Sequence, residues 1–314
     1  MKICILGAGS LGCAIGGALS AAGSEVWLVN RSRTHVEAMN TAGLRIRGEG
    51  GDDRFIKVNA ATDASAIGPV ELVIVLVKSF DTDRAIRAAT NLIGRDTAVM
   101  SLQNGLGNED IITDVIGSGH VLAGRTYIGG QLIGPGYIIS GTAGKRTIIG
   151  ELNGAITPRV ERIAAEFNRA GLETKVSANI MGTIWDKLLV NAATGPVAAI
   201  TGLAYGALYK SPLIEAVAIE AVEEAMAVAR ASGIELSIRE PREAWLRAGT
   251  GLPDDFKPSM LQSLEKGSVT EIDFINGAIV REGKRCNIPT PVNATLVACI
   301  KGIESRLTND RGRP

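Results

Sequence analysis

The fold is decided by the opening stretch Lys2-Ile3-Cys4-Ile5-Leu6-Gly7-Ala8-Gly9-Ser10-Leu11-Gly12. Its apolar, β-branched beginning predicts a buried strand that runs directly into a G-x-G-x-x-G turn. The small residues over 10–22 predict a helix, and the apolar residues over 25–29 predict a second strand that ends at Asn30. That end lies about 18 residues beyond the last glycine, close to the ~20 residues expected in a dinucleotide-binding βαβ unit. The stretch therefore predicts a Rossmann-type domain with a parallel sheet.

The glycines explain why such a turn binds a nucleotide. They permit a tight turn and a close approach of the backbone to a pyrophosphate, while the following helix supplies amide donors and a favourable dipole. A glycine-rich turn without a ligand is the alternative, and the strand and helix around the motif argue against it. We expect the cofactor to be bound by Gly7, Ala8, Gly9, Ser10, Leu11 and Gly12.

The end of the second strand indicates which dinucleotide is bound. An NAD site usually has Asp or Glu there to bind the ribose 2′-hydroxyl, but this chain has Asn30-Arg31-Ser32-Arg33. Arg31 can bind a 2′-phosphate through charge-assisted hydrogen bonds, whereas a carboxylate would repel it. The sequence thus predicts NADP(H) over NAD(H), with a solvated loop as the other interpretation of Arg31 and Arg33.

The first half of the chain alternates strands and helices, and the second half has helices alone. Further strands are expected over 71–77 and 97–102, and hairpins over 121–151 are expected to complete the sheet. Helices of the second half are expected over 179–200, 213–232, 259–282 and 291–306. The predicted fold class is α/β, with an NADP(H)-binding Rossmann-type parallel-sheet domain over residues 1–176 and an all-helical substrate domain over residues 177–314.

Composition disfavours several classes of partner. The 314 residues hold 33 Lys and Arg against 33 Asp and Glu, so no net charge attracts nucleic acid or anionic lipid. No run approaches the ~18 apolar residues that a membrane span needs. The four cysteines, none in a C-x-x-C pair, fit reduced thiols better than disulfides or a metal site. We expect a cytoplasmic protein without metal, nucleic-acid or membrane partners, and the oligomeric state stays open, a homodimer included.

Reduction of a carbonyl by a nicotinamide hydride needs a group that protonates the oxygen. His35 and His120 are poorly placed for this role, because one lies near the adenosine end of the expected site and the other begins a predicted strand. A Lys, a Tyr or an acid is then the donor. Lys187 and Asn191 are four residues apart in a predicted helix and so share a face, and Glu271 lies among apolar residues of a later predicted helix. Taken singly, such a Lys and such a Glu are usually solvated surface residues.

Six short motifs occur in one order along the chain. They are the G-x-G-x-x-G turn, Val77-Lys78, Gln103-Asn104-Gly105, Trp185-Asp186-Lys187-Leu188 with Asn191, Ser259-Met260-Leu261-Gln262, and Thr270-Glu271-Ile272-Asp273 with Asn276-Gly277. In this order they resemble the ketopantoate reductases (2-dehydropantoate 2-reductases), and the resemblance extends from Met1 to about Arg306. It implies an NADPH-binding Rossmann domain joined to a helical domain like that of 6-phosphogluconate dehydrogenase, with the active site in the cleft. It also implies reduction of a branched 2-keto acid to a D-2-hydroxy acid on the route to pantothenate.

The resemblance implies roles for single residues. Lys187 would be the general acid that protonates the reduced carbonyl oxygen, a role worth roughly 10²–10⁴ in rate, with Glu271 as its partner. Asn104 would contact the nicotinamide end of the cofactor and the substrate site, and Lys78 would contact the cofactor. Without the resemblance, a simple Asn-Gly turn is the favoured interpretation of Asn104. Lys78 then has two equally supported interpretations, a ligand-binding residue at the carboxyl end of a central strand and a solvated residue at a strand end.

On the substrate side the resemblance implies Asn191 and Ser259. The serine would bind the carboxylate, although Ser259 and Gln262 also fit a capping box at a helix N-terminus. Where the family usually reads N-x-x-x-N-P, T-G-L-P-N-G-E and Gln followed by Asp, this chain has Gly195, Tyr205, Ala207 and Ser263. A site that pairs a substrate hydroxyl discriminates far more strongly than one merely shaped for it, so these departures bear on the substrate.

The sequence therefore predicts an NADPH-dependent 2-keto acid reductase, with ketopantoate as the first candidate substrate and another 2-keto acid as the alternative. A dehydrogenase of the 6-phosphogluconate or hydroxyisobutyrate type is less favoured, because its glycine-rich substrate motif is not evident. A noncatalytic NADP(H)-binding regulator is the third reading, and the presence of both Lys187 and Glu271 argues against it.

Overall fold

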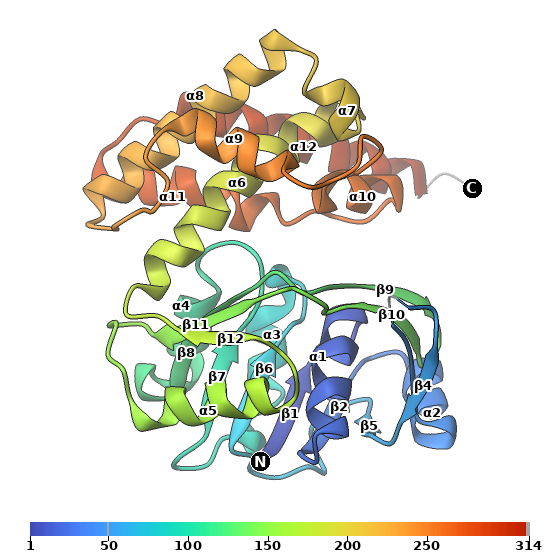
Figure 1. Cartoon of the computed structure of the whole chain (residues 1–314). Helices are drawn as coiled ribbons and strands as arrows, with labels where there is room; N and C mark the ends of the chain where they lie inside the picture. The colour runs from blue at the N-terminus through green and yellow to red at the C-terminus, as the bar shows by residue number, and fades with distance from the viewer. Residues whose placement is uncertain (49, 312–314) are drawn as a thin grey trace. The chain divides into compact units, whose positions relative to one another are not determined.

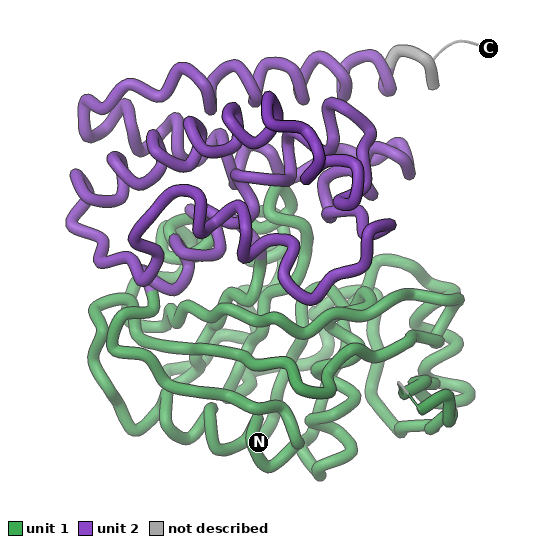
Figure 2. The backbone as a smooth tube through the Cα atoms, turned by 45° about the horizontal axis from the view of Figure 1, so that its top comes forward, with its two compact units in different colours: residues 1–103, 108–180 green, residues 104–107, 181–314 purple. Residues whose placement is uncertain are grey.

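The computed structural model describes residues 1–48 and 50–311, and they form two compact units (Figure 2). Unit 1 comprises Met1–Gln103 and Asn108–Ile180. Unit 2 comprises Asn104–Gly107 and the described residues from Met181 onward. Unit 1 is mixed α/β with a parallel sheet and unit 2 is helical, which confirms the predicted fold class.

Unit 1 is built on an eight-stranded sheet in the order β12-β11-β8-β7-β6-β1-β2-β5 (Figure 1). Its strands are β1 (Lys2–Leu6), β2 (Glu25–Val29), β5 (Asn59–Ala61), β6 (Leu72–Val75), β7 (Ala98–Ser101), β8 (Val121–Thr126), β11 (Thr147–Glu151) and β12 (Thr174–Val176). Neighbouring strands from β5 to β8 are parallel, and β11 is antiparallel to β8. The order β5-β2-β1-β6-β7-β8 is that of dinucleotide-binding folds, which bind their ligand where the strand order reverses, here between β1 and β6.

Both faces of this sheet are buried, which explains the nearly continuous apolar runs of its central strands. Ile3 and Ile5 of β1 lie in one core cluster, and Cys4 and Leu6 lie in a second cluster on the other face. The covering helices and turns are α1 (Ser10–Ala21), α2 (Arg33–Ala42), α3 (Thr82–Arg87), α4 (Asn108–Ile116), α5 (Pro158–Arg169), η1 (Ser79–Asp81), η2 (Thr90–Leu92) and η3 (Ser118–His120).

A second, four-stranded sheet has the order β4-β3-β10-β9, with β3 (Leu44–Arg47), β4 (Asp53–Ile56), β9 (Gly129–Gly134) and β10 (Tyr137–Gly141). The prediction that hairpins over 121–151 complete the main sheet is therefore right for β8 and β11 and wrong for β9 and β10. The β9–β10 hairpin pairs with β3 instead, far away in the sequence. Alternation of apolar residues predicts that a strand forms but not which partner it pairs with.

Unit 2 consists of helices α6 (Ile180–Thr201), α7 (Tyr205–Leu208), α8 (Pro212–Ala231), α9 (Pro241–Gly249), α10 (Ser259–Glu265), α11 (Asn276–Cys286) and α12 (Pro291–Arg311), with a 3₁₀ turn η4 (Ile272–Phe274). α6, α8 and α12 confirm three predicted helices, whereas α7 and α9 were not predicted.

The single helix expected over 259–282 is wrong, because the chain breaks between α10 and α11. Gly267 adopts a positive φ of 63°, which favours glycine and ends a helix. Beyond it, the backbone N–H and the hydroxyl of Thr270 both donate to Glu304 Oε1 of α12, each at 2.7 Å. These long-range bonds hold the segment before η4 out of helical geometry.

Buried polar side chains tie the helices of unit 2 together. Asn293 Nδ2 donates to the Ala221 carbonyl at 2.9 Å and to Glu224 Oε2 at 2.7 Å, and its Oδ1 accepts from Asn276 Nδ2 at 2.9 Å. The bonds connect α12 to α8 and to the start of α11. Because unpaired polar groups are costly in a core, this network selects one arrangement of these helices.

Candidate active site

The three glycines of the G-x-G-x-x-G turn occupy three different environments. Gly7 has a φ of 103°, and a Cβ atom there would lie 2.5 Å from the Leu76 carbonyl carbon of the neighbouring chain segment. A Cβ atom at Gly12 would lie 2.5 Å from the Gly7 oxygen, so this glycine lets α1 pack against the turn. By contrast, no described atom lies within 4 Å of a Cβ atom placed on Gly9.

The opening at Gly9 fits a dinucleotide. Gly9 is the N-cap residue of α1, and since it has no side chain, the first amides of α1 are not capped by it. These amides lie at the point where the strand order reverses, the place where open α/β sheets bind ligands. A pyrophosphate needs a close backbone approach and N–H donors, and this turn offers both.

Arg31 is displayed to solvent while its neighbour Asn30 is used in the turn. Asn30 Nδ2 donates to the Ala8 carbonyl at 2.8 Å, and Asn30 Oδ1 accepts from Ser32 N at 2.8 Å. The Arg31 side chain is 75% exposed and forms an ion pair with Asp81 at 3.0 Å. Arg31 is thus held at the end of β2 by an acidic partner that an anionic ligand can replace.

His35 is buried, and both of its ring nitrogens have hydrogen-bond partners within unit 1. Its Nδ1 accepts from Gly136 N at 2.9 Å, and its Nε2 lies 3.1 Å from the Ala8 carbonyl, to which it donates. Burial lowers the pKa of this imidazole, so the neutral form is favoured. The prediction that His35 is not the general acid agrees with this environment.

Lys78 lies at the carboxyl end of the central strand β6, as predicted, three residues beyond its last residue and directly before the η1 turn. The two residues beside it are fixed through their carbonyl groups. Gln103 Nε2 donates to the Val77 carbonyl at 2.8 Å, and Thr82 Oγ1 donates to the Ser79 carbonyl at 2.8 Å. The exposed Lys78 therefore stands on a rigid backbone at the carboxyl edge of the sheet.

The segment that carries Asn104 belongs to unit 2, although the strands before and after it belong to unit 1. Leu106 N donates to the Phe274 carbonyl of η4 at 2.8 Å. Gly105 has a φ of 91°, and a Cβ atom there would lie 2.5 Å from the Phe274 oxygen. Asn104 thus begins an Asn-Gly turn that packs on the residues directly after Glu271. The sequence does not predict this contact.

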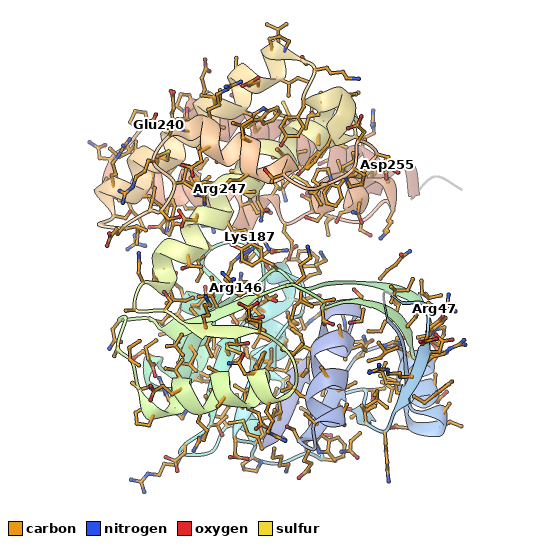
Figure 3. The ribbon with its side chains drawn as sticks, in the orientation of Figure 1. Arg47, Arg146, Lys187, Glu240, Arg247 and Asp255 are labelled. Carbon is orange, nitrogen blue, oxygen red and sulfur yellow. The ribbon has the colours of Figure 1, made fainter. Side chains whose placement is uncertain are left out.

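Helix α6 presents Lys187 and Asn191 one turn apart, as predicted (Figure 3 labels Lys187). Trp185 is buried, and Asp186 Oδ1 accepts the backbone N–H groups of Ser237 at 3.0 Å and Ile238 at 3.2 Å. The residues before Lys187 therefore anchor the helix, while Lys187 and Asn191 are only partly buried. Within the Trp-Asp-Lys sequence, the first two residues thus fix the part of the helix that carries the lysine.

Glu271 does not lie in a helix, which corrects the prediction. It is the residue before η4, and residues on both sides of it along the chain, Thr270 and Asp273, are tied to α12. Thr270 bonds Glu304, as described above, and Asp273 forms an ion pair with Lys301 at 2.8 Å. The position of Glu271 therefore depends on a helix some 30 residues further on, and local sequence could not reveal this.

The predicted capping box at Ser259 is also wrong. Ser259 is the first residue of α10 and Pro258 is its N-cap, so the serine hydroxyl is one position too late to cap the helix. Gln262 Nε2 bonds the Lys257 carbonyl at 2.7 Å instead. Ser259 is exposed, which leaves the proposed substrate role without a competing capping role.

Two of the positions that depart from the family pattern are apolar in character. A Cβ atom at the buried Gly195 would lie 3.5 Å from the Met260 methyl carbon, so Met260 fills the space beside this glycine. Tyr205 is buried, its hydroxyl lies 3.1 Å from Thr194 Oγ1, and its ring packs 5.0 Å from that of Phe256. At both positions this chain therefore has packed apolar groups where the family pattern has the side-chain amide of an Asn.

Two of the four cysteines, Cys4 and Cys13, are buried. Burial raises the pKa of the Cys4 and Cys13 thiols to about 12, which makes them unreactive at neutral pH. Among residues 1–48 and 50–311, no three His, Cys, Asp or Glu side chains cluster as a metal site. Nor is any helix in this part of the chain long and apolar enough to cross a membrane.

Family models match both parts of the chain. A model described as ketopantoate reductase PanE/ApbA matches residues 3–154, and its C-terminal counterpart matches residues 179–304. The 2-dehydropantoate 2-reductase of Pyrococcus horikoshii is 39% identical over 305 residues, which cover 97% of this chain and 98% of that protein. The enzyme of the same name from Halobacterium salinarum is 33% identical over 307 residues, with 96% and 98% covered.

Solved structures show the same likeness. A PanE/ApbA family ketopantoate reductase from Ralstonia eutropha superposes with a TM-score of 0.89 at 36% identity, covering 98% of this chain and all of that one. A D-mandelate dehydrogenase, solved with NADH and anilino(oxo)acetate, superposes with a TM-score of 0.90 at 28% identity and the same coverage. The chain therefore belongs to the ketopantoate reductase family, a family of oxidoreductases.

Proposed function

We propose that this protein reduces a 2-keto acid to a D-2-hydroxy acid with NADPH, and that its substrate is ketopantoate. Residues 1–176 would bind the cofactor and residues 177–314 would supply the groups for the substrate. The observation that carries the proposal is the pair on α6, where Lys187 and Asn191 stand one turn apart on a helix that Trp185 and Asp186 anchor. An ammonium and an amide in this arrangement can protonate one oxygen of a substrate while binding another.

The bound cofactor supplies the hydride, and the protein supplies the proton and the orientation. Lys187 Nζ donates its proton to the oxygen of the reduced carbonyl, with Glu271 as its acidic partner. The Asn191 amide and the Ser259 hydroxyl bind the substrate, the serine at its carboxylate. On the cofactor side, Asn104 would contact the nicotinamide end, Lys78 would contact the cofactor, and Gly7 to Gly12 would bind the pyrophosphate.

Steady-state turnover tests this function. NADPH oxidation is followed with ketopantoate, 2-oxoisovalerate, 2-oxobutyrate, oxaloacetate and pyruvate, and the best substrate is repeated with NADH. Ketopantoate as the clearly preferred substrate supports an enzyme of pantothenate biosynthesis. If another acid is preferred, the proposed reaction stands and the proposed substrate is wrong. If the protein binds NADPH without any turnover, the proposal that it is an enzyme is wrong. Light scattering on the same preparation decides whether the protein is a homodimer.

The preference for NADPH depends on Arg31. Arg31→Ala should weaken NADPH binding by roughly tenfold or more while changing NADH binding little, because a charge-assisted bond to the 2′-phosphate is lost only with NADPH. Dissociation constants from nicotinamide fluorescence measure both. Arg87→Ala, which removes another exposed guanidinium paired with an Asp, is the matched control. Equal losses for the two cofactors would contradict the assignment.

A second candidate substrate class follows from Gly195 and Met260. A 2-keto acid with a bulky apolar side chain, such as phenylglyoxylate, fits apolar surface better than a substrate hydroxyl does, and a structural relative acts on mandelate. The panel therefore includes phenylglyoxylate and 3,3-dimethyl-2-oxobutyrate, which is ketopantoate without its hydroxyl.

Gly195→Asn tests this specificity directly. We expect it to raise the preference for ketopantoate over 3,3-dimethyl-2-oxobutyrate by about tenfold or more, because the amide gains a hydroxyl partner and the flexible Met260 side chain can move aside. The measurement is the ratio of kcat/KM values for the two acids. Gly195→Ala adds a Cβ without the amide, so an equal ratio in both variants would show that the amide does not contact the substrate.

A further inference from the structure

A buried chain of polar side chains lies beneath the carboxyl edge of the main sheet in unit 1. It contains Thr82, Ser101, Gln103, Asn108 and Glu109, each at most 6% exposed. Ser101 Oγ donates to Gln103 Oε1 at 3.3 Å, and Gln103 Nε2 donates to Thr82 Oγ1 at 2.8 Å. Thr82 Oγ1 in turn lies 3.2 Å from Asn108 Oδ1. A connected network of buried polar groups makes a core rigid and favours one arrangement of its side chains.

This network holds both segments that carry the proposed cofactor residues. Gln103 and Asn108 are the residues directly before and after the Asn104–Gly107 segment, so the network clamps both ends of the turn that begins with Asn104. The same side chains bond the Val77 and Ser79 carbonyls on either side of Lys78. One set of hydrogen bonds thus holds the backbone beside Lys78 and the two residues that flank the Asn104–Gly107 segment.

Glu109 is the last residue of the network, and one of its two carboxyl oxygens has no hydrogen-bond partner in the described part of the chain. The residue is 5% exposed, and the oxygen without a partner is Oε2. A buried oxygen without a partner calls for a functional or structural reason. Burial raises the pKa of this carboxyl to about 7, against opposing effects of its own backbone N–H and the Ser101 hydroxyl. The charged groups that face it are Arg125 of β8, which lowers its pKa, and Asp110 of α4, which raises it.

The Ser101 hydroxyl has a single proton to donate. When Glu109 is ionised, its carboxylate attracts this proton, and Gln103 Oε1 loses its donor. When Glu109 is protonated, its own O–H can donate to Ser101 Oγ, and the hydroxyl proton is available to Gln103. The protonation state of Glu109 therefore decides whether the bond from Ser101 to Gln103 is made.

We propose that Glu109 is a positioning residue that, when protonated, completes the chain of hydrogen bonds that runs from Ser101 through Gln103 to Thr82. It would thereby hold the backbone beside Lys78 and the residues that flank the Asn104–Gly107 segment in place for the cofactor. The inference rests on the proposed function, because it uses the cofactor roles of Lys78 and Asn104. It adds a residue that touches neither substrate nor cofactor and makes cofactor affinity depend on pH near neutrality.

The test compares NADPH dissociation constants from pH 6 to pH 8.5 in the wild type and three variants, with fluorescence as the readout. In Glu109→Gln, the amide N–H donates to Ser101 at every pH. Relative to this variant, the wild type should bind equally well at pH 6 and about fivefold more weakly at pH 8.5, the equivalent of one hydrogen bond. The 2′-phosphate of NADPH ionises near pH 6, but this effect is common to all the proteins and cancels in the ratio.

Two further variants separate positioning from a merely structural role. Glu109→Met has similar volume but no donor, so it should bind weakly at every pH. Asp114→Asn, at an exposed residue of the same helix α4, should keep the wild-type profile. Thermal unfolding supplies a readout without cofactor. A carboxyl with a raised pKa binds its proton more tightly when folded, so the stability it contributes falls as pH rises from about 4.5 toward 7. Glu109→Gln should therefore gain stability over the wild type across that range.

Each outcome decides a separate point. The positioning role is overturned if the ratio of the NADPH dissociation constants of the wild type and Glu109→Gln does not change with pH, or if Glu109→Gln and Glu109→Met bind NADPH equally well. In either case, NADPH binding by the wild type still upholds the proposed function. A wild type that binds neither NADPH nor NADH overturns both.

Discussion

Lys187→Ala is expected to lower kcat by roughly 10²–10⁴-fold and to leave the NADPH dissociation constant nearly unchanged, because the variant lacks only the proton donor. The helix should survive, since Trp185 and the Asp186 bonds to Ser237 and Ile238 are untouched and alanine favours helices. Stopped-flow or steady-state NADPH oxidation measures the first quantity and fluorescence titration the second.

The matched control for this variant is Lys210→Ala, which removes an exposed lysine from the same unit. It should turn over like the wild type. If Lys187→Ala keeps kcat within a few-fold, Lys187 is not the general acid. If it loses NADPH binding as well as turnover, the lysine acts on the cofactor instead, and the mechanism proposed above is wrong.

Gly7→Ala is expected to destabilise the protein by about 3 kcal/mol or more, a large part of the stability of an ordinary domain. The residue combines a φ of 103° with a Cβ position 2.5 Å from the Leu76 carbonyl carbon. Backbone atoms of a buried strand end cannot move aside as a flexible side chain can. Thermal unfolding monitored by circular dichroism measures the loss.

Gly9→Ala is the matched comparison within the same turn. No described atom lies within 4 Å of the added methyl group, and Gly9 has a negative φ of −79°, so the melting temperature should stay close to that of the wild type. NADPH binding should nevertheless weaken, because the methyl group occupies the space that a pyrophosphate needs. A Gly9→Ala variant with unchanged affinity would show that the cofactor does not approach this turn.

Residues outside recognisable motifs were the ones that sequence reasoning missed. The Glu109 network is an example, since a Glu in the first turn of a helix ordinarily faces solvent and is favoured there by the helix dipole. A signal for it does exist, because Arg125 interrupts the otherwise apolar run of β8. A charged residue in a strand that is buried on both faces requires polar or charged partners nearby. Glu109, which interacts electrostatically with Arg125, is one of these partners.

The features that the sequence by itself determined are local motifs and periodic patterns of residues. The G-x-G-x-x-G turn, the strands that flank it, the spacing of Lys187 and Asn191, and the change from α/β to helical texture all follow from neighbouring residues, since glycine conformation and side-chain periodicity act over a few positions.

Only the tertiary structure decided which distant segments meet. It paired β10 with β3, placed the Asn104–Gly107 segment on η4, and used Glu304 to hold Thr270 out of a helix beside Glu271. Each of these results depends on hydrogen bonds between residues at least 30 positions apart. Such bonds form only when the whole core brings the partners together, so they leave no pattern in the local sequence.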